Sequence, residues 1–173
     1  LIKTGMDSKP VLSRFEQDML DSRVGAEYRD VILSQGGQDD EMNMVRKHIK
    51  VEPARYYYHC DRLDVLVWQD MPSGFAPAQH VLPNDVGEGR KKSVVAEQYE
   101  LELRRMLNRL HAHPCIVMWV IHNEGWGQFD TRRLADWVKA LDPSRLVNAV
   151  SGWRDVDAGD IRDTHDYSEA PAA

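Results

Sequence analysis

Along most of this sequence, short strand-like segments alternate with segments in which apolar side chains recur at helical spacing. Strands are predicted at residues 42–48, 65–68, 115–121, 146–150 and 161–165. Helices are predicted from Pro53 to about residue 63, over residues 95–110 and over residues 131–141. In the last helix, the residues predicted to face inward are Leu134, Trp137, Val138 and Leu141. This alternation predicts an α/β fold with a parallel sheet joined by right-handed crossovers.

The segment 115–121 carries the clearest strand signal, because every residue in it is apolar. Such a strand is expected to be covered on both faces, as parallel strands are. Asn123 and Glu124 follow it directly, and a glycine-rich turn comes next. Catalytic groups of parallel α/β enzymes collect at the carboxyl ends of strands. Glu124 is therefore the leading candidate for a catalytic acid.

A long loop is predicted over residues 71–92, where prolines and glycines are frequent. A loop of this length in a compact domain usually has a function. If it follows a barrel strand, it overhangs the face that holds the active site. We therefore predict that it forms a wall of the cleft.

Several ordered segments of this chain resemble glycoside hydrolase family 2, which includes β-galactosidases, β-glucuronidases and β-mannosidases. The resemblance is carried by residues 43–48, 61–70, 113–127, 141–147 and 163–167, with the Asn123–Glu124 pair at its centre. It extends over about residues 42–167 and does not include residues 1–41. We accordingly predict an unassigned segment at 1–41 and part of a catalytic barrel domain at 42–173.

The resemblance implies a partial (β/α)8 TIM barrel containing about strands 2 to 6 of 8. A complete barrel needs about 250 residues, whereas this sequence has 173. Cleavage of a glycosidic bond by a retaining enzyme requires two carboxyl groups. In the family, the nucleophile is a glutamate at the end of the seventh strand, which we expect beyond residue 173. The chain alone is therefore predicted to be inactive.

Site residues follow from the same resemblance. Glu124 is predicted to be the general acid/base, and Trp126 supplies apolar surroundings that help to keep it protonated. Asn123 is similar to the family residue that hydrogen-bonds the sugar 2-hydroxyl. The other predicted substrate-binding residues are Arg46 and His48 on one strand face, Trp68 as a stacking platform, Asp70 as a hydroxyl acceptor, Trp126 beside the acid, and His165 and Tyr167 along the sugar site.

Composition narrows the possible partners. The net charge of −6 and the scattered basic residues leave no concentrated positive face, so nucleic acid is not expected. No apolar segment approaches the roughly 20 residues of a membrane span, and no membrane association is predicted. Cys60 and Cys115 do not form a Cys-x-x-Cys pair and are predicted to be buried, unreactive side chains. The expected partner is a carbohydrate substrate, and no cofactor or metal is implied.

Two alternatives stay open at this stage. Histidines at 48, 59, 111, 113, 122 and 165 suggest a metal-dependent barrel hydrolase. However, the His111-Ala112-His113 sequence precedes its strand and would lie on the face opposite the barrel mouth. The second alternative is a non-catalytic carbohydrate-binding remnant that keeps the acid and the aromatic side chains. The sequence does not choose between galactoside, glucuronide and mannoside substrates.

Overall fold

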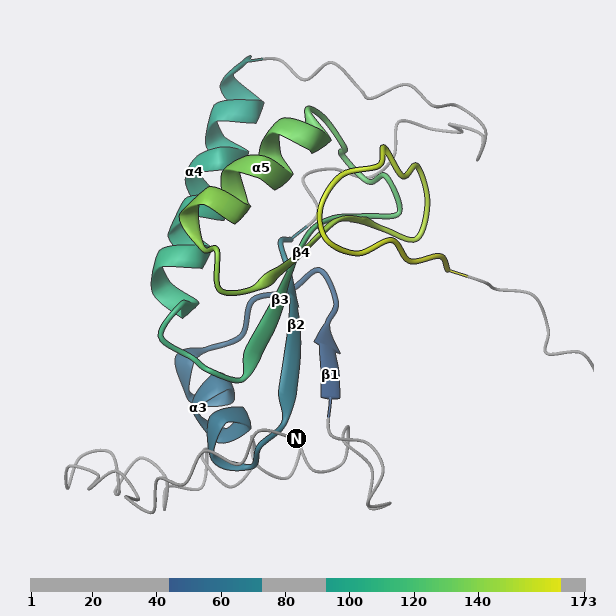
Figure 1. The fold of residues 1–173 in the computed structure, drawn as a ribbon. Helices are drawn as coiled ribbons and strands as arrows, with labels where there is room; N and C mark the ends of the chain where they lie inside the picture. The colour runs from purple at the N-terminus through teal and green to yellow at the C-terminus, as the bar shows by residue number, and fades with distance from the viewer. Residues whose placement is uncertain (1–43, 73–92, 166–173) are drawn as a thin grey trace, which may run out of the picture.

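The computed structural model describes residues 44–72 and 93–165, which form strands and helices in strict alternation (Figure 1). The predicted segment 1–41, the loop at 73–92 and Tyr167 lie outside the described residues. The elements in chain order are β1 (Met44–Lys47), α3 (Ala54–Arg62), β2 (Leu66–Asp70), α4 (Ser93–Leu110), β3 (Ile116–Asn123), α5 (Thr131–Leu141) and β4 (Leu146–Ser151).

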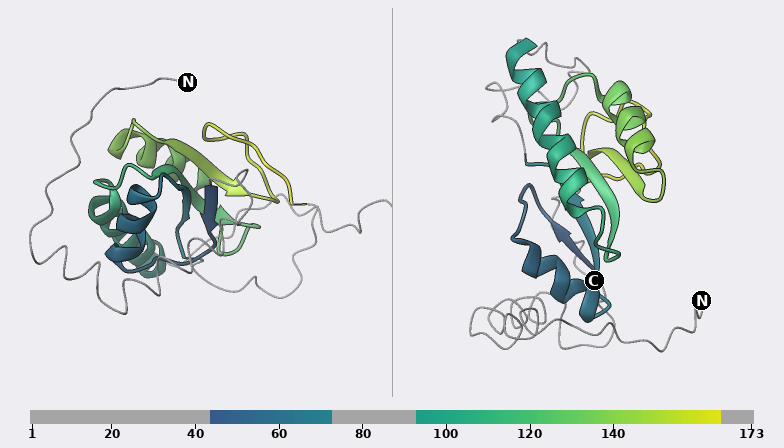
Figure 2. Two further views of the ribbon diagram at one scale, coloured as in Figure 1. Left: turned by 90° about the horizontal axis from the view of Figure 1, so that it is seen from below. Right: turned by 90° about the vertical axis from the view of Figure 1, so that its left-hand side faces the viewer.

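The described strands form a single parallel sheet in the sequential order β1-β2-β3-β4. Helices α3, α4 and α5 all lie on the same side of this sheet, as Figures 1 and 2 show. A sequentially ordered parallel sheet with its helices on one side is wound in a single direction, which is the arrangement of a barrel. The predicted fold class, a partial α/β TIM barrel, is confirmed.

The main hydrophobic core lies between the sheet and these helices. Trp119 of β3 and Leu103 of α4 are fully buried there, and the amphipathic α5 contributes Leu134 and Val138. Leu141, which we predicted to face inward, is 43% exposed because it is the last residue of α5 and extends past the sheet. On the solvent-exposed side, an ion pair between Glu100 of α4 and Arg133 of α5 links the two helices.

The predicted strand at 161–165 is not formed. Instead, Gly159 and Asp160 pair with the edge of β4: the Asp160 N–H donates to the Val147 carbonyl, and the Val147 N–H donates to the Asp160 carboxylate. Gly159 has a φ of 81°, and a Cβ there would lie 2.6 Å from the Val147 carbonyl oxygen. At this point, the Val147 N–H at the edge of β4 is therefore bonded to a side-chain carboxylate and not to the backbone of another strand.

The sheet face opposite the helices is less completely covered at its amino-terminal end. Met44, Leu66 and Leu146 are each the first residue of a strand, and they are 40%, 37% and 42% exposed. Register pairs Met44 with Leu66, so these side chains share one face. An exposed apolar layer on the inner face is what part of a barrel presents.

In the part of the chain that the structure describes, none of the helices has the length and apolar character needed to span a membrane.

The segment 141–147, one of the motifs noted in the sequence, holds the amino-terminal side of the sheet together. Asp142 accepts hydrogen bonds from Trp119 Nε1 (2.9 Å), the Ser144 hydroxyl (2.5 Å) and Arg145 (2.6 Å). Arg145 also donates to the carbonyls of Ile116, His111 and His113. Burial alone would raise the pKa of Asp142, but the hydrogen bonds from Ser144, Trp119 and Arg145 outweigh it and lower the pKa to about 2.

This lowered pKa predicts a pH-dependent contribution of Asp142 to stability. A carboxylate whose pKa is lower in the folded state stabilises above its ordinary pKa, and the stabilisation is lost as pH falls through the folded value. We expect Asp142→Asn to reduce the free energy of unfolding by about 2 kcal/mol at pH 6, with the difference from wild type disappearing between pH 4 and pH 2. Urea unfolding at several pH values measures it.

The matched control is Asp64→Asn in the exposed turn between α3 and β2, where Asn tolerates the observed φ of 55° equally well. The control should leave the free energy of unfolding nearly unchanged throughout the pH range. An Asp142→Asn difference that is constant with pH would contradict the assignment.

Candidate active site

Glu124 lies in the turn directly after β3, at the carboxyl end of the sheet. Its φ of 52° is unusual for a residue with a side chain, and its N–H donates to the Ser151 carbonyl at 2.8 Å. Gly125 follows with a φ of 70°, and a Cβ there would collide with the Arg154 side chain. Figure 1 shows the turn after β3 beside the segment that follows β4. These constraints fix the direction in which the Glu124 side chain leaves the backbone.

The Glu124 carboxylate is held by a histidine from a distant part of the chain. His165 Nδ1 lies 2.8 Å from Glu124 Oε1, and the Glu124 side chain is only 11% exposed. The other ring nitrogen, Nε2, lies 3.1 Å from an Arg46 nitrogen and 2.9 Å from the Ser151 hydroxyl. The acid predicted from the sequence is therefore part of a hydrogen-bonded cluster.

Arg46 of β1 connects the ends of three strands. Its guanidinium donates to both carboxylate oxygens of Asp70 at 3.0 and 2.9 Å, and to Asn123 Oδ1 at 2.9 Å. Together with the contact to His165, these bonds link Arg46 on β1 to β2, to β3 and to the segment after β4. Planar, bidentate pairing of this kind is specific to arginine. The structure thus brings together Arg46, Asp70, Asn123, Glu124 and His165.

Asp70 was predicted to accept a hydrogen bond from a substrate hydroxyl, but in the structure its carboxylate accepts hydrogen bonds from within the protein. Its side chain is 1% exposed, and its oxygens are occupied by Arg46 and by the Ile49 N–H. His48 is mostly exposed, with Nδ1 3.6 Å from Asp70 Oδ2. Trp68, two residues before Asp70 in β2, shares its strand face and is half-buried. Trp126 is also half-buried, two residues after Glu124.

Ser151 and Asp163 belong to the cluster but were not assigned a role from the sequence. The Ser151 hydroxyl donates to Asp163 Oδ2 at 2.7 Å, and the Gly152 N–H donates to Asp163 Oδ1 at 3.0 Å. Burial raises the pKa of Asp163, but hydrogen bonds, led by that from Ser151, outweigh it and hold the pKa below its usual range. The available signals were the position of Ser151 at the end of a parallel strand and the presence of Asp163 in the motif 163–167.

The remaining histidines and the cysteines lie in separate structural environments. His113 pairs with Asp61 at the amino-terminal side of the sheet, and His122 stacks on Tyr99 of α4. Within 44–72 and 93–165, no three side chains of His, Cys, Asp or Glu gather in a way that could hold a metal ion. Cys60 and Cys115 are buried, as predicted, and a hydrogen bond from Cys60 together with burial raises the pKa of the Cys115 thiol.

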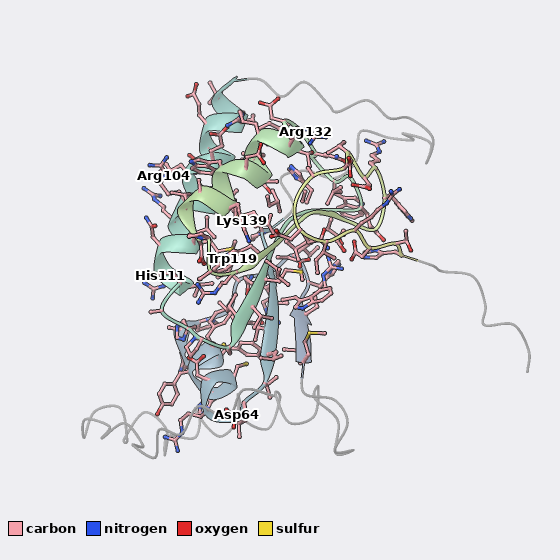
Figure 3. All side chains as sticks on the ribbon, viewed as in Figure 1. Asp64, Arg104, His111, Trp119, Arg132 and Lys139 are labelled. Carbon is pink, nitrogen blue, oxygen red and sulfur yellow. The ribbon has the colours of Figure 1, made fainter. Side chains whose placement is uncertain are left out.

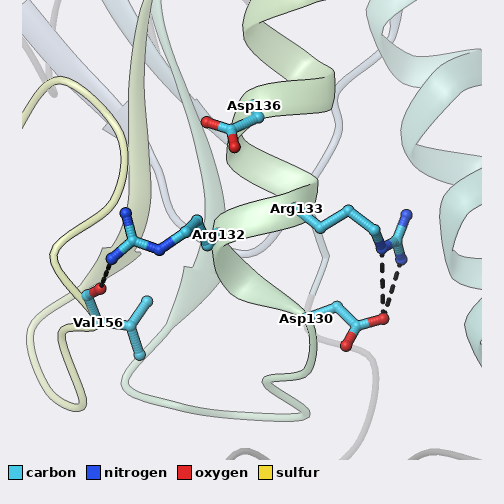
Figure 4. Close-up of a pocket in the computed structure, with 5 residues that line it drawn as sticks. All are labelled: Asp130, Arg132, Arg133, Asp136 and Val156. Atoms are coloured by element: carbon cyan, nitrogen blue, oxygen red, sulfur yellow. Dashed lines mark hydrogen bonds and ion pairs between the residues drawn. The ribbon is translucent and has the colours of Figure 1, made fainter.

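A hollow lies outside this cluster, at the amino-terminal end of α5. It has a volume of about 570 Å³ and is lined by Asp130, Arg132, Arg133, Asp136 and Val156. Figure 4 shows Arg132 reaching the Val156 carbonyl and Arg133 reaching Asp130. Figure 3 places Arg132 at the opposite end of the helical layer from His111. The lining of the hollow contains acidic and basic side chains together with Val156, and it includes none of the predicted site residues.

The winding of the sheet, with a polar cluster at its carboxyl end, defines this chain as part of a TIM barrel, and solved structures agree. The β-D-mannosidase of Dictyoglomus thermophilum matches with a TM-score of 0.59 and 22% identity, covering 84% of this chain and 19% of that one. A β-glucuronidase of Parabacteroides merdae matches with a TM-score of 0.53 and 21% identity, covering 72% and 15%. At these identities the matches show the fold alone.

The family is shown by sequence. Residues 41–169 match the family described as "Glycosyl hydrolases family 2, TIM barrel domain". The chain belongs to this family, and by family it is a glycosidase domain. This confirms the resemblance that the motifs around Glu124 indicated.

Curated relatives are much longer than this chain. A β-galactosidase of Klebsiella pneumoniae (strain 342) is 26% identical over 166 residues, which is 90% of this chain and 15% of the relative. A β-mannosidase B of Aspergillus clavatus is 31% identical over 105 residues, which is 56% of this chain and 11% of the relative. The chain thus spans about 15% of the length of the β-galactosidases that it matches.

Proposed function

We propose that this chain supplies the general acid/base half of the active site of a retaining β-glycosidase. The observation that carries the proposal is the Glu124 carboxylate at the carboxyl end of β3, held by His165 beside Arg46 and Asn123. Retaining cleavage needs one carboxylic acid that protonates the leaving oxygen and then activates water. The Glu124 side chain is mostly buried and is fixed by a hydrogen bond, which are suitable conditions for that role.

The neighbouring side chains position the sugar in this proposal. Asn123 presents its amide nitrogen while its oxygen is held by Arg46, so the NH₂ group is the part directed to a sugar hydroxyl. Asp70 orients Arg46 and binds sugar indirectly through it. Trp68, His48, Trp126, His165 and Tyr167 complete the proposed substrate-binding set. The substrate is a β-galactoside, β-glucuronide or β-mannoside, the substrate classes of the relatives by name.

The nucleophile is supplied from outside residues 1–173 in this proposal. Retaining enzymes hold their two carboxyl groups about 5 to 5.5 Å apart. Among the described residues, the acids nearest to Glu124 in the cluster are committed elsewhere: Asp70 to Arg46, and Asp163 to Ser151 and Gly152. In this proposal, both carboxylates position other groups of the cluster and neither is the nucleophile. The chain alone is therefore proposed not to turn over glycosides.

Covalent trapping tests this proposal. The longer protein that contains this chain would be treated with 2-deoxy-2-fluoro glycosides carrying a dinitrophenyl leaving group, one for each of the three sugars. The labelled residue would then be found by peptide mass mapping. We expect one sugar to inactivate the protein and the label to lie on a glutamate outside residues 1–173. A label on Glu124, or binding of the sugar without inactivation or hydrolysis, would overturn the proposal, and the second result would favour a carbohydrate-binding remnant.

A further inference from the structure

The imidazole of His165 has two sets of partners that require opposite positions of its proton. Arg46 carries only donors, so its contact with Nε2 needs that nitrogen to be unprotonated. Ser151 donates its single hydroxyl proton to the Asp163 carboxylate at 2.7 Å. Its oxygen can therefore only accept from Nε2, which then must carry the proton.

Each arrangement corresponds to one protonation state of Glu124. With the proton on Nε2, the bare Nδ1 accepts from the protonated carboxylic acid of Glu124. With the proton on Nδ1, His165 donates to the Glu124 carboxylate across the same 2.8 Å. The imidazole stays neutral in both cases. Conversion of the first state to the second releases a single proton to water, because the pair goes from two protons to one.

We infer that Ser151 and Asp163 are positioning residues that favour the acid form of Glu124 through the tautomer of His165, while Arg46 favours the base form. This inference rests on the proposed function of Glu124. An enzyme whose acid must later act as a base needs both states to be hydrogen-bonded. The two contacts at His165 Nε2, one with Arg46 and one with Ser151, meet this need, because each suits one protonation state of Glu124.

Among the described residues, other charged groups lie near the cluster on several neighbouring elements. Arg46 comes from β1, Asp70 from β2, and Arg154 packs over the turn that contains Gly125. His48 is mostly exposed, and its Nδ1 lies 3.6 Å from Asp70 Oδ2. The positive charge of Arg46 is largely matched by Asp70, so Arg46 acts on His165 mainly through its contact with Nε2, in competition with the Ser151 hydroxyl that Asp163 orients.

The test combines a pH profile with a direct reading of the tautomer. Ser151→Ala removes the acceptor for the Nε2 proton. In the longer protein, we expect the alkaline limb of the kcat/KM profile to move to lower pH by about half to one unit, the size set by one hydrogen bond. Nitrogen-15 shifts of His165 should show a larger Nδ1–H population. Ser151→Thr keeps the hydroxyl and should restore both readouts.

Ser144→Ala is the matched control, because it removes an equivalent serine–aspartate hydrogen bond at the opposite end of the sheet. It should lower stability without moving the profile or the tautomer. An unchanged tautomer in both Ser151→Ala and Asp163→Asn would overturn the inference, even if the protein is an active glycosidase. A shifted tautomer in a protein without glycosidase activity would uphold the linkage of His165 to Ser151 and instead refute the proposed function.

Discussion

Glu124→Gln is expected to lower kcat/KM on a glycoside with an unactivated leaving group by about 100- to 10,000-fold, the usual contribution of a general acid. The amide keeps the size of the side chain and can still meet His165, but it has no proton to give. A dinitrophenyl glycoside needs no protonation of its leaving group, so its glycosylation step should change by less than about tenfold. The measurement is a steady-state and pre-steady-state comparison of the two substrates in the longer protein.

Glu97→Gln provides the control for this prediction. Glu97 is exposed on α4, in the helical layer and not in the cluster around Glu124, so the same chemical change should leave both substrates unaffected. Equal losses on the two substrates in Glu124→Gln would indicate a structural role rather than acid catalysis.

Arg46→Met is expected to produce the largest loss of stability at the site. Asp70 is 1% exposed, and Arg46 is the only arginine or lysine among its ion-pair partners in the described residues. Removing one member of a buried ion pair leaves an uncompensated charge and costs about 3–5 kcal/mol. Urea unfolding of the chain measures this loss. Arg109→Met, on the exposed face of α4, should cost less than about 0.5 kcal/mol.

A double variant separates the charge from the packing. Arg46→Met combined with Asp70→Leu removes both charges, and we expect it to recover more than half of the lost stability. The recovery should be incomplete, because the Ile49 N–H loses its acceptor. A single variant as stable as wild type would show that the pair is solvated, contrary to its burial in this structure.

Local patterns predicted much of this fold. The apolar segment 115–121 became the core of β3, and the helix expected at 131–141 is α5 with the same bounds. Both signals depend only on neighbours in sequence, namely on apolar periodicity and run length. Glu124 was selected as the candidate acid in the same way, because it directly follows the clearest strand.

Long-range side-chain contacts account for what the sequence did not predict. The segment 161–165 has strand-like composition, yet Asp160 caps the edge of β4 with its carboxylate and prevents regular pairing. Asp70 is held by Arg46, 24 residues away, so its role as an anchor was not visible from strand spacing. The bond between Ser151 and His165 likewise joins residues from two segments whose approach is set by the tertiary fold.

Azide rescue of Glu124→Ala tests the central claim most directly, because the shortened side chain leaves room for the azide ion where the carboxyl group stood. In a retaining β-glycosidase that lacks its acid/base, azide attacks the glycosyl-enzyme intermediate from the face that the leaving group left, without needing a general base. We predict that azide restores turnover of the dinitrophenyl β-glycoside and that the product is the β-glycosyl azide, identified by proton NMR. An α-glycosyl azide would make Glu124 the nucleophile, and an absence of rescue would contradict its role as the acid/base.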